Sequence, residues 1–308
     1  MTAAALTLVS GYAADRLLGD PARFHPVAGF GRLGSALERR LWRPTRPAGV
    51  LHAASLVGGV AVATRLAERA LPPRPRVIFR VLTVWAALGG RSLERAALAL
   101  ADAVEQGDVA RARTLAPTLV GRDPSQLDGP ELCRAAVESV AENVSDAVVA
   151  PLLWAALLGA PGVAAYRAAN TLDAMVGHRS ERYVRFGWAS ARLDDLVNWP
   201  AARLSALVAI AWAPAVGGDR RAAWRSAWRD GAAHPSPNAG RIEGAFAGAL
   251  AVRLGGLNHY EHGFERRPQL GDGSPPSPAD IGRAVQLARF VGASTAALCA
   301  LIAWGRRG

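Results

Sequence analysis

Hydrophobic residues gather in six stretches that are separated by polar segments. The stretches cover residues 2–18, 49–66, 77–89, 144–163, 200–216 and 284–304. The second, fourth and last approach the roughly 20 residues that a membrane-spanning helix needs, whereas the third is short for one. This pattern predicts an all-α, polytopic helical membrane protein with about four or five membrane helices and large polar helical loops.

Two longer polar regions lie between these stretches, at about 91–143 and 217–283. Apolar residues recur at helical spacing from Leu93 to Val104, which predicts an amphipathic helix there. Neither region alternates apolar and polar residues for long enough to predict a sheet, and no internal repeat divides the chain. We therefore expect one integral-membrane domain over residues 1–308.

Composition supports a membrane location and narrows the chemistry. Hydrophobic residues make up 51% of the chain and charged residues 20%, with a mean hydropathy of +0.12, which is more apolar than an ordinary soluble enzyme. All 36 basic residues are arginine, so a P-loop lysine and Schiff-base chemistry are excluded. The net charge of +11 fits an anionic membrane surface and anionic substrates. No nucleic-acid-binding motif accompanies it, so we expect no nucleic-acid partner.

Carboxylates and amides form three clusters close to these apolar segments. The clusters are Glu138-Ser-Val-Ala-Glu142-Asn143-Val-Ser-Asp146, Asn170-Thr-Leu-Asp173 and Asp194-Asp195-Leu-Val-Asn198. A charge in such surroundings costs several kcal/mol unless it is paired or bound to a metal. We therefore interpret the stretch from Glu138 to Asn198 as the active site.

The first cluster predicts a stripe of carboxylates on one helix face. Glu138, Glu142 and Asp146 are spaced i, i+4 and i+8, which keeps them on the same side of a helix. Like charges in a stripe repel unless they face water, are partly protonated, or are bridged by arginine or a divalent cation. A catalytic or magnesium cluster is our preferred interpretation, and a solvated helix face is the alternative.

The other two clusters have the composition of a magnesium site. Asn170 and Asp173 are i, i+3 neighbours, and Asp194 or Asp195 can meet Asn198 in the same way. Mg²⁺ prefers oxygen ligands, usually one or two carboxylates completed by substrate phosphate and water. The alternative is that these residues cap helices at membrane boundaries.

Two proline-fixed loops present side chains that can bind phosphate or act as an acid or base. One carries Asp20 and His25, each followed by proline, and the other carries His234, Ser236 and Asn238. Proline holds such loops still, which suits preorganised binding. Turn residues without a function are the alternative.

Seven runs, in this order and over nearly the whole chain, resemble a known family. They are Gly19-Asp20-Pro21 with His25-Pro26-Val27, Gly121-Arg122-Asp123, Glu138-Ser-Val-Ala-Glu142-Asn143, Asn170-Thr-Leu-Asp173-Ala-Met-Val-Gly177, Ala191-Arg192-Leu-Asp194-Asp195, Ser236-Pro-Asn238-Ala-Gly240 and Arg253-Leu-Gly-Gly256. Together they resemble the cobalamin-biosynthesis CobD/CbiB family. The chain departs from the family pattern at the edges of these motifs and leaves the acids intact; the departures are Pro124, Ala147, Ala174, His178 and Arg241.

The resemblance implies a multi-pass enzyme of the cell (cytoplasmic) membrane. Its implied reaction is an ATP-dependent ligation of adenosylcobyric acid to (R)-1-amino-2-propanol phosphate, which gives adenosylcobinamide phosphate. The implied cofactors are ATP and Mg²⁺, and the implied surroundings are the lipid bilayer. A homo-oligomer and other cobalamin-pathway enzymes remain open as partners.

Roles then follow from this chemistry as hypotheses. Mg²⁺ is assigned to Asp173, Asp194 and Asp195, assisted by Asn170 and Asn198. Arg91, Arg122 and Arg192 are assigned to phosphate, and Glu138 or Glu142 to deprotonating the amine, with Asp146 in the same catalytic cluster. Asp20, His25, Asp123 and Asn143 are further substrate-binding candidates, and His234, Ser236 and Asn238 are assigned to the aminopropanol phosphate.

Two other functions fit the same residues. An intramembrane, magnesium-dependent prenyltransferase also places Asn- and Asp-rich motifs at the mouth of a helical bundle. A non-catalytic membrane sensor or assembly protein on the same fold is the third possibility.

Overall fold

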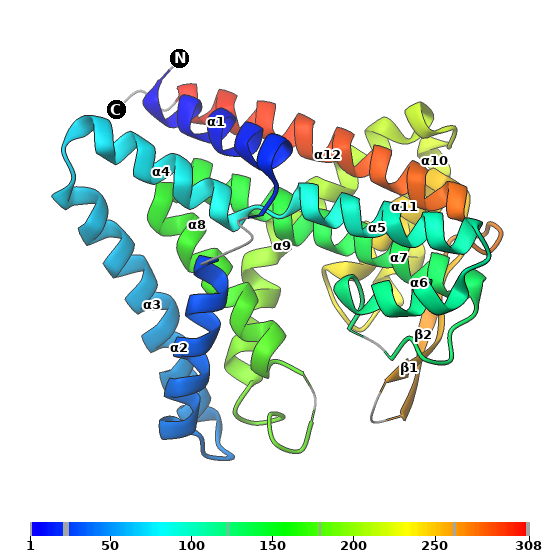
Figure 1. Cartoon of the computed structure of the whole chain (residues 1–308), viewed down its shortest axis with the longest axis horizontal. Helices are drawn as coiled ribbons and strands as arrows, with labels where there is room; N and C mark the ends of the chain where they lie inside the picture. Colours follow the sequence, from blue (N-terminus) through cyan, green and yellow to red (C-terminus); the bar gives the residue numbers. More distant parts are fainter. Residues whose placement is uncertain (1, 21–24, 122, 179, 261–262, 306–308) are drawn as a thin grey trace. The chain divides into compact units, whose positions relative to one another are not determined.

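The computed structural model describes residues 2–20, 25–121, 123–178, 180–260 and 263–305, with only the backbone for 258–260 and 263–265. Arg122, one of the predicted phosphate ligands, lies outside these residues. Contacts divide the chain into two compact units (Figure 1). The first comprises Met1–Gly89, Asp146–Asn198 and Ala296–Gly308, and the second comprises Gly90–Ser145 and Trp199–Thr295. The expected single domain stays a prediction.

The first unit is a bundle of helices around α8. Its helices are α1 (Ala3–Leu18), α2 (Pro26–Leu41), α3 (Arg46–Ala70), α4 (Pro73–Ala87), α8 (Ala150–Val176), the start of α9 (Trp188–Trp212) and the end of α12 (Pro278–Gly305). α2, α3 and α4 all pack against α8, and α1 packs on α4. Ala53 and Leu56 of α3 form a buried cluster with Leu172 of α8. This packing fixes the face of α8 that carries the polar residues described below.

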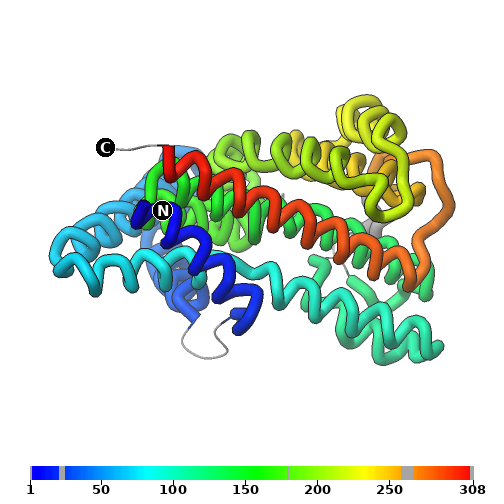
Figure 2. Tube along the Cα trace, turned by 90° about the horizontal axis from the view of Figure 1, so that it is seen from above, coloured from blue at the N-terminus to red at the C-terminus, as the bar shows by residue number. Residues whose placement is uncertain are grey.

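Two ends of the chain meet in the first unit. The start of α1 lies beside the end of α12, where the Thr2 hydroxyl donates a hydrogen bond of 3.1 Å to the Ala303 carbonyl (Figures 1 and 2). The same Thr2 oxygen accepts from the Ala5 N–H and so caps α1. The Thr2 side chain therefore caps the start of α1 and also ties α1 to α12.

α8 is bent, because its sequence interrupts the helix. Gly159 has φ +70°, a left-handed conformation that glycine adopts without steric cost, and Pro161 follows it. Before α8, residues Ser145–Val149 form a π-helical turn that joins it to α7 (Gly129–Val144). Tyr166 and Asn170 lie on the part of α8 that follows the bend.

The second unit surrounds a buried helix. It contains α5 (Gly90–Glu105), α6 (Val109–Leu115), α7, the rest of α9, α10 (Arg220–Arg225), α11 (Ala239–Leu250) and the strands β1 (Leu254–Tyr260) and β2 (Gly263–Leu270). Short turns of other helix types link them: Ala116–Thr118, Ala213–Val216, Ser226–Asp230 and Gly231–Ala233. Eleven of the twelve residues of α11 are buried, all except Arg241. α5 confirms the predicted amphipathic helix.

The sequence pattern missed a small antiparallel hairpin, formed by β1 and β2. The register shifts between Leu254 and Gly256, where Gly255 and Gly256 have φ of +78° and +98°. Glycines and clustered charges in these segments hide the two-residue periodicity of a strand. The expectation of no sheet was therefore wrong for this hairpin, although the fold is all-α as predicted.

Four helical segments of the described chain are long and apolar enough to cross a membrane. They are Arg46–Ala70, Gly129–Val176, Trp188–Val216 and Pro278–Gly305. The prediction of four or five membrane helices is confirmed at four, and the protein is a polytopic helical membrane protein. α1 has 16 residues and α4 has 15, so both fall short of the length that a span needs.

Candidate active site

Five polar side chains of the first unit form one hydrogen-bonded network between α8, α9 and the π-helical turn. Asn170 Nδ2 donates to Asp146 Oδ2 and to Asp194 Oδ1, both at 3.2 Å. Asn198 Nδ2 donates to Asp194 Oδ2 at 2.9 Å. The Tyr166 hydroxyl lies 2.8 Å from Asn198 Oδ1 and 2.9 Å from the Asp146 carbonyl oxygen. We call these five residues the acid–amide network.

Helical spacing brings the members of the network together in pairs. Tyr166 and Asn170 are one turn apart on α8, and Asp194 and Asn198 are one turn apart on α9. α8 and α9 are also joined by the Trp154 indole N–H, which donates to the Val197 carbonyl at 3.0 Å. The two pairs therefore face each other across a fixed contact.

The network is closed by amide groups. Both hydrogens of the Asn170 amide have a carboxylate acceptor, and both oxygens of Asp194 accept from an amide nitrogen. The amide oxygen of Asn170, Oδ1, accepts from Arg167 Nη1 at 3.3 Å. Two carboxylates are thus brought to one amide nitrogen within membrane-spanning helices.

The donor set suits Mg²⁺ only in part. Asp146 and Asp194 supply two carboxylates with amide oxygens nearby, which matches the usual preference of this ion when substrate phosphate completes the shell. Among the described residues, however, no group of three or more His, Cys, Asp and Glu side chains could hold a metal ion. Oxygen atoms of both carboxylates already accept hydrogen bonds from the Asn170 amide, so these bonds would have to give way to an ion.

Asp173 and Asp195 have neighbours outside this network. Asp173 is one turn beyond Asn170, and its backbone oxygen accepts from the Gly177 N–H. Asp195 is paired with Arg192 at 3.4 Å, and the Arg192 side chain is 64% exposed. The assignment of the metal to these two acids stays a prediction.

Asp20 and His25 stand at the loop before α2. A Cβ placed on Gly89 would be 3.8 Å from Asp20 Oδ1 and 3.6 Å from the Cβ of Ala147, so Asp20 lies near the π-helical turn. His25 caps α2, and its Nδ1 accepts from the Val27 N–H at 3.2 Å. Asp20 is therefore close in space to Ala147, the chain neighbour of Asp146, whereas the Nδ1 atom of His25 is engaged in the cap of α2. The assignment of both residues to substrate stays a prediction.

The acids of α7 have different surroundings. Glu138 Oε1 accepts from the Gly255 N–H at 2.8 Å and from Arg134 at 3.4 Å, and its side chain is 12% exposed. Glu142, one turn later, is exposed, and the Asn143 amide donates back to the Ser139 carbonyl at 2.9 Å. Glu138 thus anchors the start of β1, while Glu142 lies at an exposed position of α7.

A polar cavity of about 330 Å³ lies beside Glu138 in the second unit. Its wall contains two arginines and two acids together with the glycines of the β1 bulge: Arg134, Arg253, Asp128, Glu131, Gly255 and Gly256 are among its lining residues. Asp128 and Glu131 form a capping box at the start of α7. The cavity therefore presents both signs of charge to one small ligand.

The His234 loop is largely tied to its own backbone. His234 Nδ1 accepts from the Ser236 N–H at 3.1 Å, and Ser236 Oγ accepts from the N–H of Ala239 at 3.1 Å. Asn238 Oδ1 accepts from Arg203 Nη1 at 2.7 Å. These bonds hold the loop rigidly and place a guanidinium beside it.

The remaining predicted residues are scattered. Arg91 begins α5, and its buried Nε has no hydrogen-bond partner within the described chain. Asp123 accepts from the backbone and hydroxyl of Ser125, both at 2.9 Å. Four residues of the sites escaped the sequence analysis: Arg134, Tyr166, Arg167 and Arg203. The spacing of Tyr166 from Asn170 was the one available signal, and a tyrosine within an apolar helix is ordinarily part of the core.

Comparison with known proteins gives one consistent result. The family model described as CobD/Cbib protein matches residues 8–288. A relative named "Cobalamin biosynthesis protein CobD" from Mycobacterium tuberculosis (strain ATCC 25618 / H37Rv) is 52% identical over 304 residues, which cover 98% of this chain and 97% of the relative. Relatives of the same name from Chromobacterium violaceum and Geobacter metallireducens are each 44% identical, over 89% and 92% of this chain and 88% and 91% of their own. No solved structure matches.

Proposed function

The chain belongs to the CobD/CbiB family and acts in cobalamin biosynthesis, and we propose that it is the ligase that forms adenosylcobinamide phosphate. In this reaction the carboxyl group of adenosylcobyric acid is joined to the amine of (R)-1-amino-2-propanol phosphate, with ATP converted to ADP and phosphate. The observation that carries the proposal is the acid–amide network within the membrane helices. A purely structural core would not require two carboxylates there.

Formation of the amide requires an activated carboxyl group. Its conversion to an acyl phosphate draws on ATP and Mg²⁺, which supply the phosphoryl group and offset its charge. Asp146 and Asp194 are the residues that would hold the metal, and Asn170 and Asn198 orient their carboxylates.

The amine must lose a proton before it attacks the acyl group, because an ammonium nitrogen has no lone pair. Of the two predicted bases, Glu138 is held by the Gly255 N–H and Arg134. Glu142 is exposed on the next turn of α7. We therefore assign the proton transfer to Glu142 and a positioning role to Glu138.

The polar cavity of the second unit matches the chemistry of the amine substrate. Aminopropanol phosphate carries an ammonium group and a phosphate, and the cavity wall carries Asp128 and Glu131 together with Arg134 and Arg253. Opposite charges are thus available to both ends of one small molecule. The rigid His234 loop is the second candidate for this substrate.

The test is the reaction itself. Full-length protein in detergent is incubated with adenosylcobyric acid, aminopropanol phosphate, ATP and Mg²⁺, and the product is identified by mass. We expect the amide from the wild type, at least about 100-fold less from Asp194→Asn, and normal turnover from Asp102→Asn, an exposed acid on α5. Full turnover by Asp194→Asn would contradict the assigned site. Turnover of a prenyl diphosphate in place of these substrates would instead indicate the prenyltransferase.

The proposed location is the cell membrane, and the four candidate membrane helices support a location in a membrane. Fractionation of cells that produce the tagged chain would test it. We expect the protein in the inner-membrane fraction, resistant to extraction by salt or alkali and released by detergent.

A further inference from the structure

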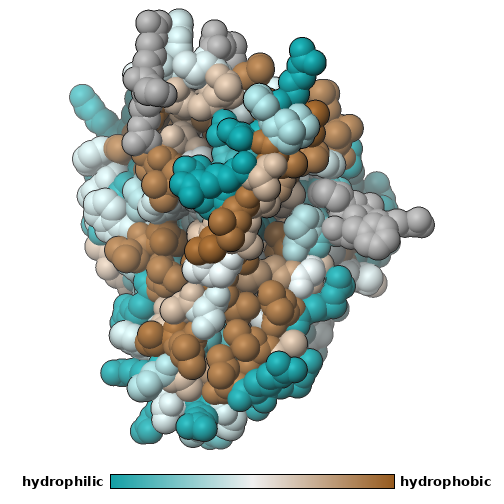
Figure 3. Space-filling model, turned by 90° about the vertical axis from the view of Figure 1, so that its left-hand side faces the viewer, coloured by the Kyte–Doolittle hydropathy of each residue, from teal (hydrophilic) through white to brown (hydrophobic). Residues whose placement is uncertain are grey.

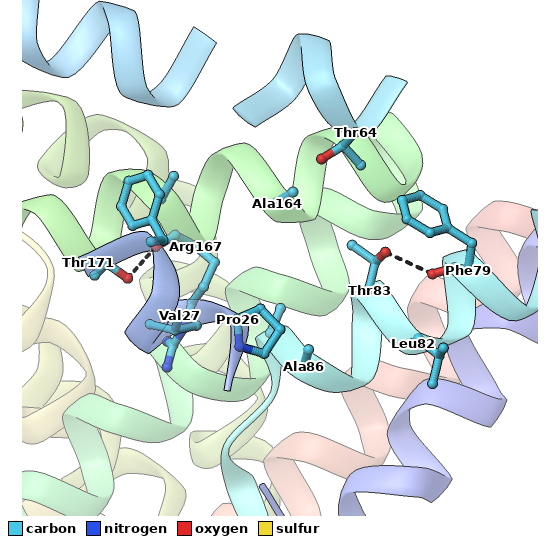
Figure 4. A pocket seen from close by; sticks show the side chains of 13 residues that line it. Pro26, Val27, Thr64, Phe79, Leu82, Thr83, Ala86, Ala164, Arg167 and Thr171 are labelled. Atoms are coloured by element: carbon cyan, nitrogen blue, oxygen red, sulfur yellow. Dashed lines mark hydrogen bonds between the residues drawn. The ribbon is translucent and has the colours of Figure 1, made fainter. Parts of the chain in front are cut away.

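An apolar cavity within the first unit lies apart from the proposed chemistry. It has a volume of about 430 Å³ and lies between α2, α3, α4 and α8 (Figure 4). Phe30, Phe79, Leu82 and Ala164 contribute to its wall, and Arg167 is its one charged lining residue among those described. Cavities of roughly 300–1,000 Å³ are the size that binds small molecules in proteins.

Two of the three threonine hydroxyls of the wall have acceptors within their own helices. The Thr83 hydroxyl donates to the Phe79 carbonyl at 2.8 Å, and the Thr171 hydroxyl donates to the Arg167 carbonyl at 2.7 Å (Figure 4). Both bonds stay within one helix. Arg167 Nη1 donates to Asn170, but the buried Nε of Arg167 has no hydrogen-bond partner within the described chain. A guanidinium in an apolar wall attracts an acceptor, and an anionic one fits best.

The helices that enclose the cavity also carry an apolar outer surface. Val62 and Leu66 of α3 are 58% and 59% exposed, and Ile78 and Leu82 of α4 are 60% and 50% exposed. Apolar side chains of this kind gather on the face shown in Figure 3. Leu82 belongs both to this surface and to the cavity wall. A ligand can therefore reach the cavity from the hydrocarbon of a bilayer.

We propose that the cavity binds an anionic phospholipid, with an acyl chain against the apolar wall and a phosphate oxygen accepting from Arg167. The wall excludes a nucleotide or corrinoid, whose many polar groups would lose hydrogen bonds there. A neutral apolar molecule would bring no acceptor for the guanidinium. An anionic lipid satisfies both the apolar wall and the cation.

The site touches the acid–amide network through a single residue. Asn170 accepts from Arg167 Nη1, so an anion held by this guanidinium also fixes the donor of Asn170. The bound lipid thus steadies the orientation of Asn170. The proposal concerns lipid binding alone and holds whichever reaction the protein catalyses.

Lipid retention by the full-length protein tests the proposal. The protein, delipidated in a nonionic detergent, is mixed with phosphatidylglycerol or phosphatidylcholine of identical acyl chains, and bound lipid is counted by native mass spectrometry. We expect the wild type to retain phosphatidylglycerol about tenfold better, as the loss of a charge-assisted hydrogen bond implies. Arg167→Gln should retain both lipids equally, because it keeps a polar group for Asn170 without the charge.

Two matched variants distinguish lipid binding in this cavity from nonspecific lipid adhesion to the protein surface. Ala164→Phe occupies the cavity and should abolish the retention, whereas Ala174→Phe, at an exposed position of the same helix, should behave as the wild type. If Ala164→Phe does not fold, Thr64→Leu narrows the cavity from α3. Equal retention of the two lipids by the wild type, or retention unchanged in a folded cavity-filling variant, would overturn the proposal. So would displacement of the lipid by inorganic phosphate, which would point to a soluble anion.

Discussion

Asn198 donates a hydrogen bond of 2.9 Å from its amide nitrogen to the Asp194 carboxylate, one turn earlier on the same helix. The same amide accepts from Tyr166, so its orientation is fixed by both partners. The Asn198 amide therefore gives Asp194 a hydrogen-bond donor, which an ionised acid at position 198 could not provide. Replacement of this amide by a carboxylate tests how strongly the stability of the network depends on charge.

Asn198→Asp places a second carboxylate against Asp194 in a buried position. We expect the free energy of unfolding to fall by about 2 kcal/mol or more, because Asp194 loses the donor at Oδ2 and two buried carboxylates then face each other. The double variant Asp194→Asn/Asn198→Asp restores one acid and one amide and should recover most of this loss. Thermal unfolding in detergent measures both. Strictly additive effects of the two substitutions would show that the pair is not coupled.

Glu138 and Glu142 should respond differently to neutral substitution. Glu142→Gln should leave the free energy of unfolding within about 0.5 kcal/mol of the wild type, because the side chain is exposed. It should nevertheless lower kcat. The change of kcat with pH that a catalytic carboxylate causes in the wild type should also be absent from this variant.

Glu138→Ala should instead destabilise the protein by roughly 1–3 kcal/mol, since the Gly255 N–H and Arg134 lose their acceptor. Glu138→Gln keeps an acceptor oxygen and should keep most of the turnover. The opposite result, with Glu138→Gln inactive and Glu142→Gln fully active, would reassign the base to Glu138.

The sequence predicted the kinds of residue in the site better than their pairing. It placed Asn170 with Asp173, but the described hydrogen bonds join Asn170 to Asp146 and Asp194. Contacts between helices depend on how α8 and α9 pack, and the spacing along one helix does not contain that information. The π-helical turn at Ser145–Val149 adds a second obstacle, because 100° per residue no longer describes the chain there.

The membrane helices were predictable because they do not depend on contacts between distant residues. Length and hydropathy are local properties, and a stretch such as 284–304 reveals itself without knowledge of its neighbours. The hairpin at Leu254–Leu270 shows where such reasoning ends. Its strands are specified by the pairing of their backbones and by the contact of Glu138 with Gly255, which lie 117 positions apart in the chain.

Arg253 offers a test of the polar cavity as the site of the amine substrate. Arg253→Gln should raise KM for aminopropanol phosphate about tenfold and leave KM for ATP unchanged, because one cation of the cavity wall is lost. Arg111→Gln, at an exposed position of α6, is the matched control and should change neither constant. An unchanged KM in Arg253→Gln would direct attention to the His234 loop.

Asp230 should contribute to the dependence of stability on pH. Partial burial acts to raise the pKa of its carboxyl, but hydrogen bonds from Arg229 and the Gly271 N–H outweigh this and lower the pKa overall. A lowered pKa in the folded state means that the stabilisation is complete above the unfolded value, near 4, and is lost as the pH falls through the folded value. Thermal unfolding should separate the wild type from Asp230→Asn at pH 7, and the difference should shrink below about pH 4. If the difference in stability between the two proteins were constant over this pH range, Asp230 would not contribute to the pH dependence.

Gly248 should be intolerant of a side chain, because α10 approaches α11 at this glycine. A Cβ at Gly248 would lie 2.5 Å from the Ala222 carbonyl oxygen and from the Cα of Ala223, both backbone atoms that cannot rotate away. We expect Gly248→Ala to lower the free energy of unfolding by about 1–3 kcal/mol through overpacking. Gly282→Ala is the matched control, since this glycine of α12 has nothing within 4 Å of a Cβ and should gain up to about 1 kcal/mol from helix propensity. Unfolding of both variants in the same detergent gives the comparison, and equal stabilities would show that α10 can move away from α11 at little cost.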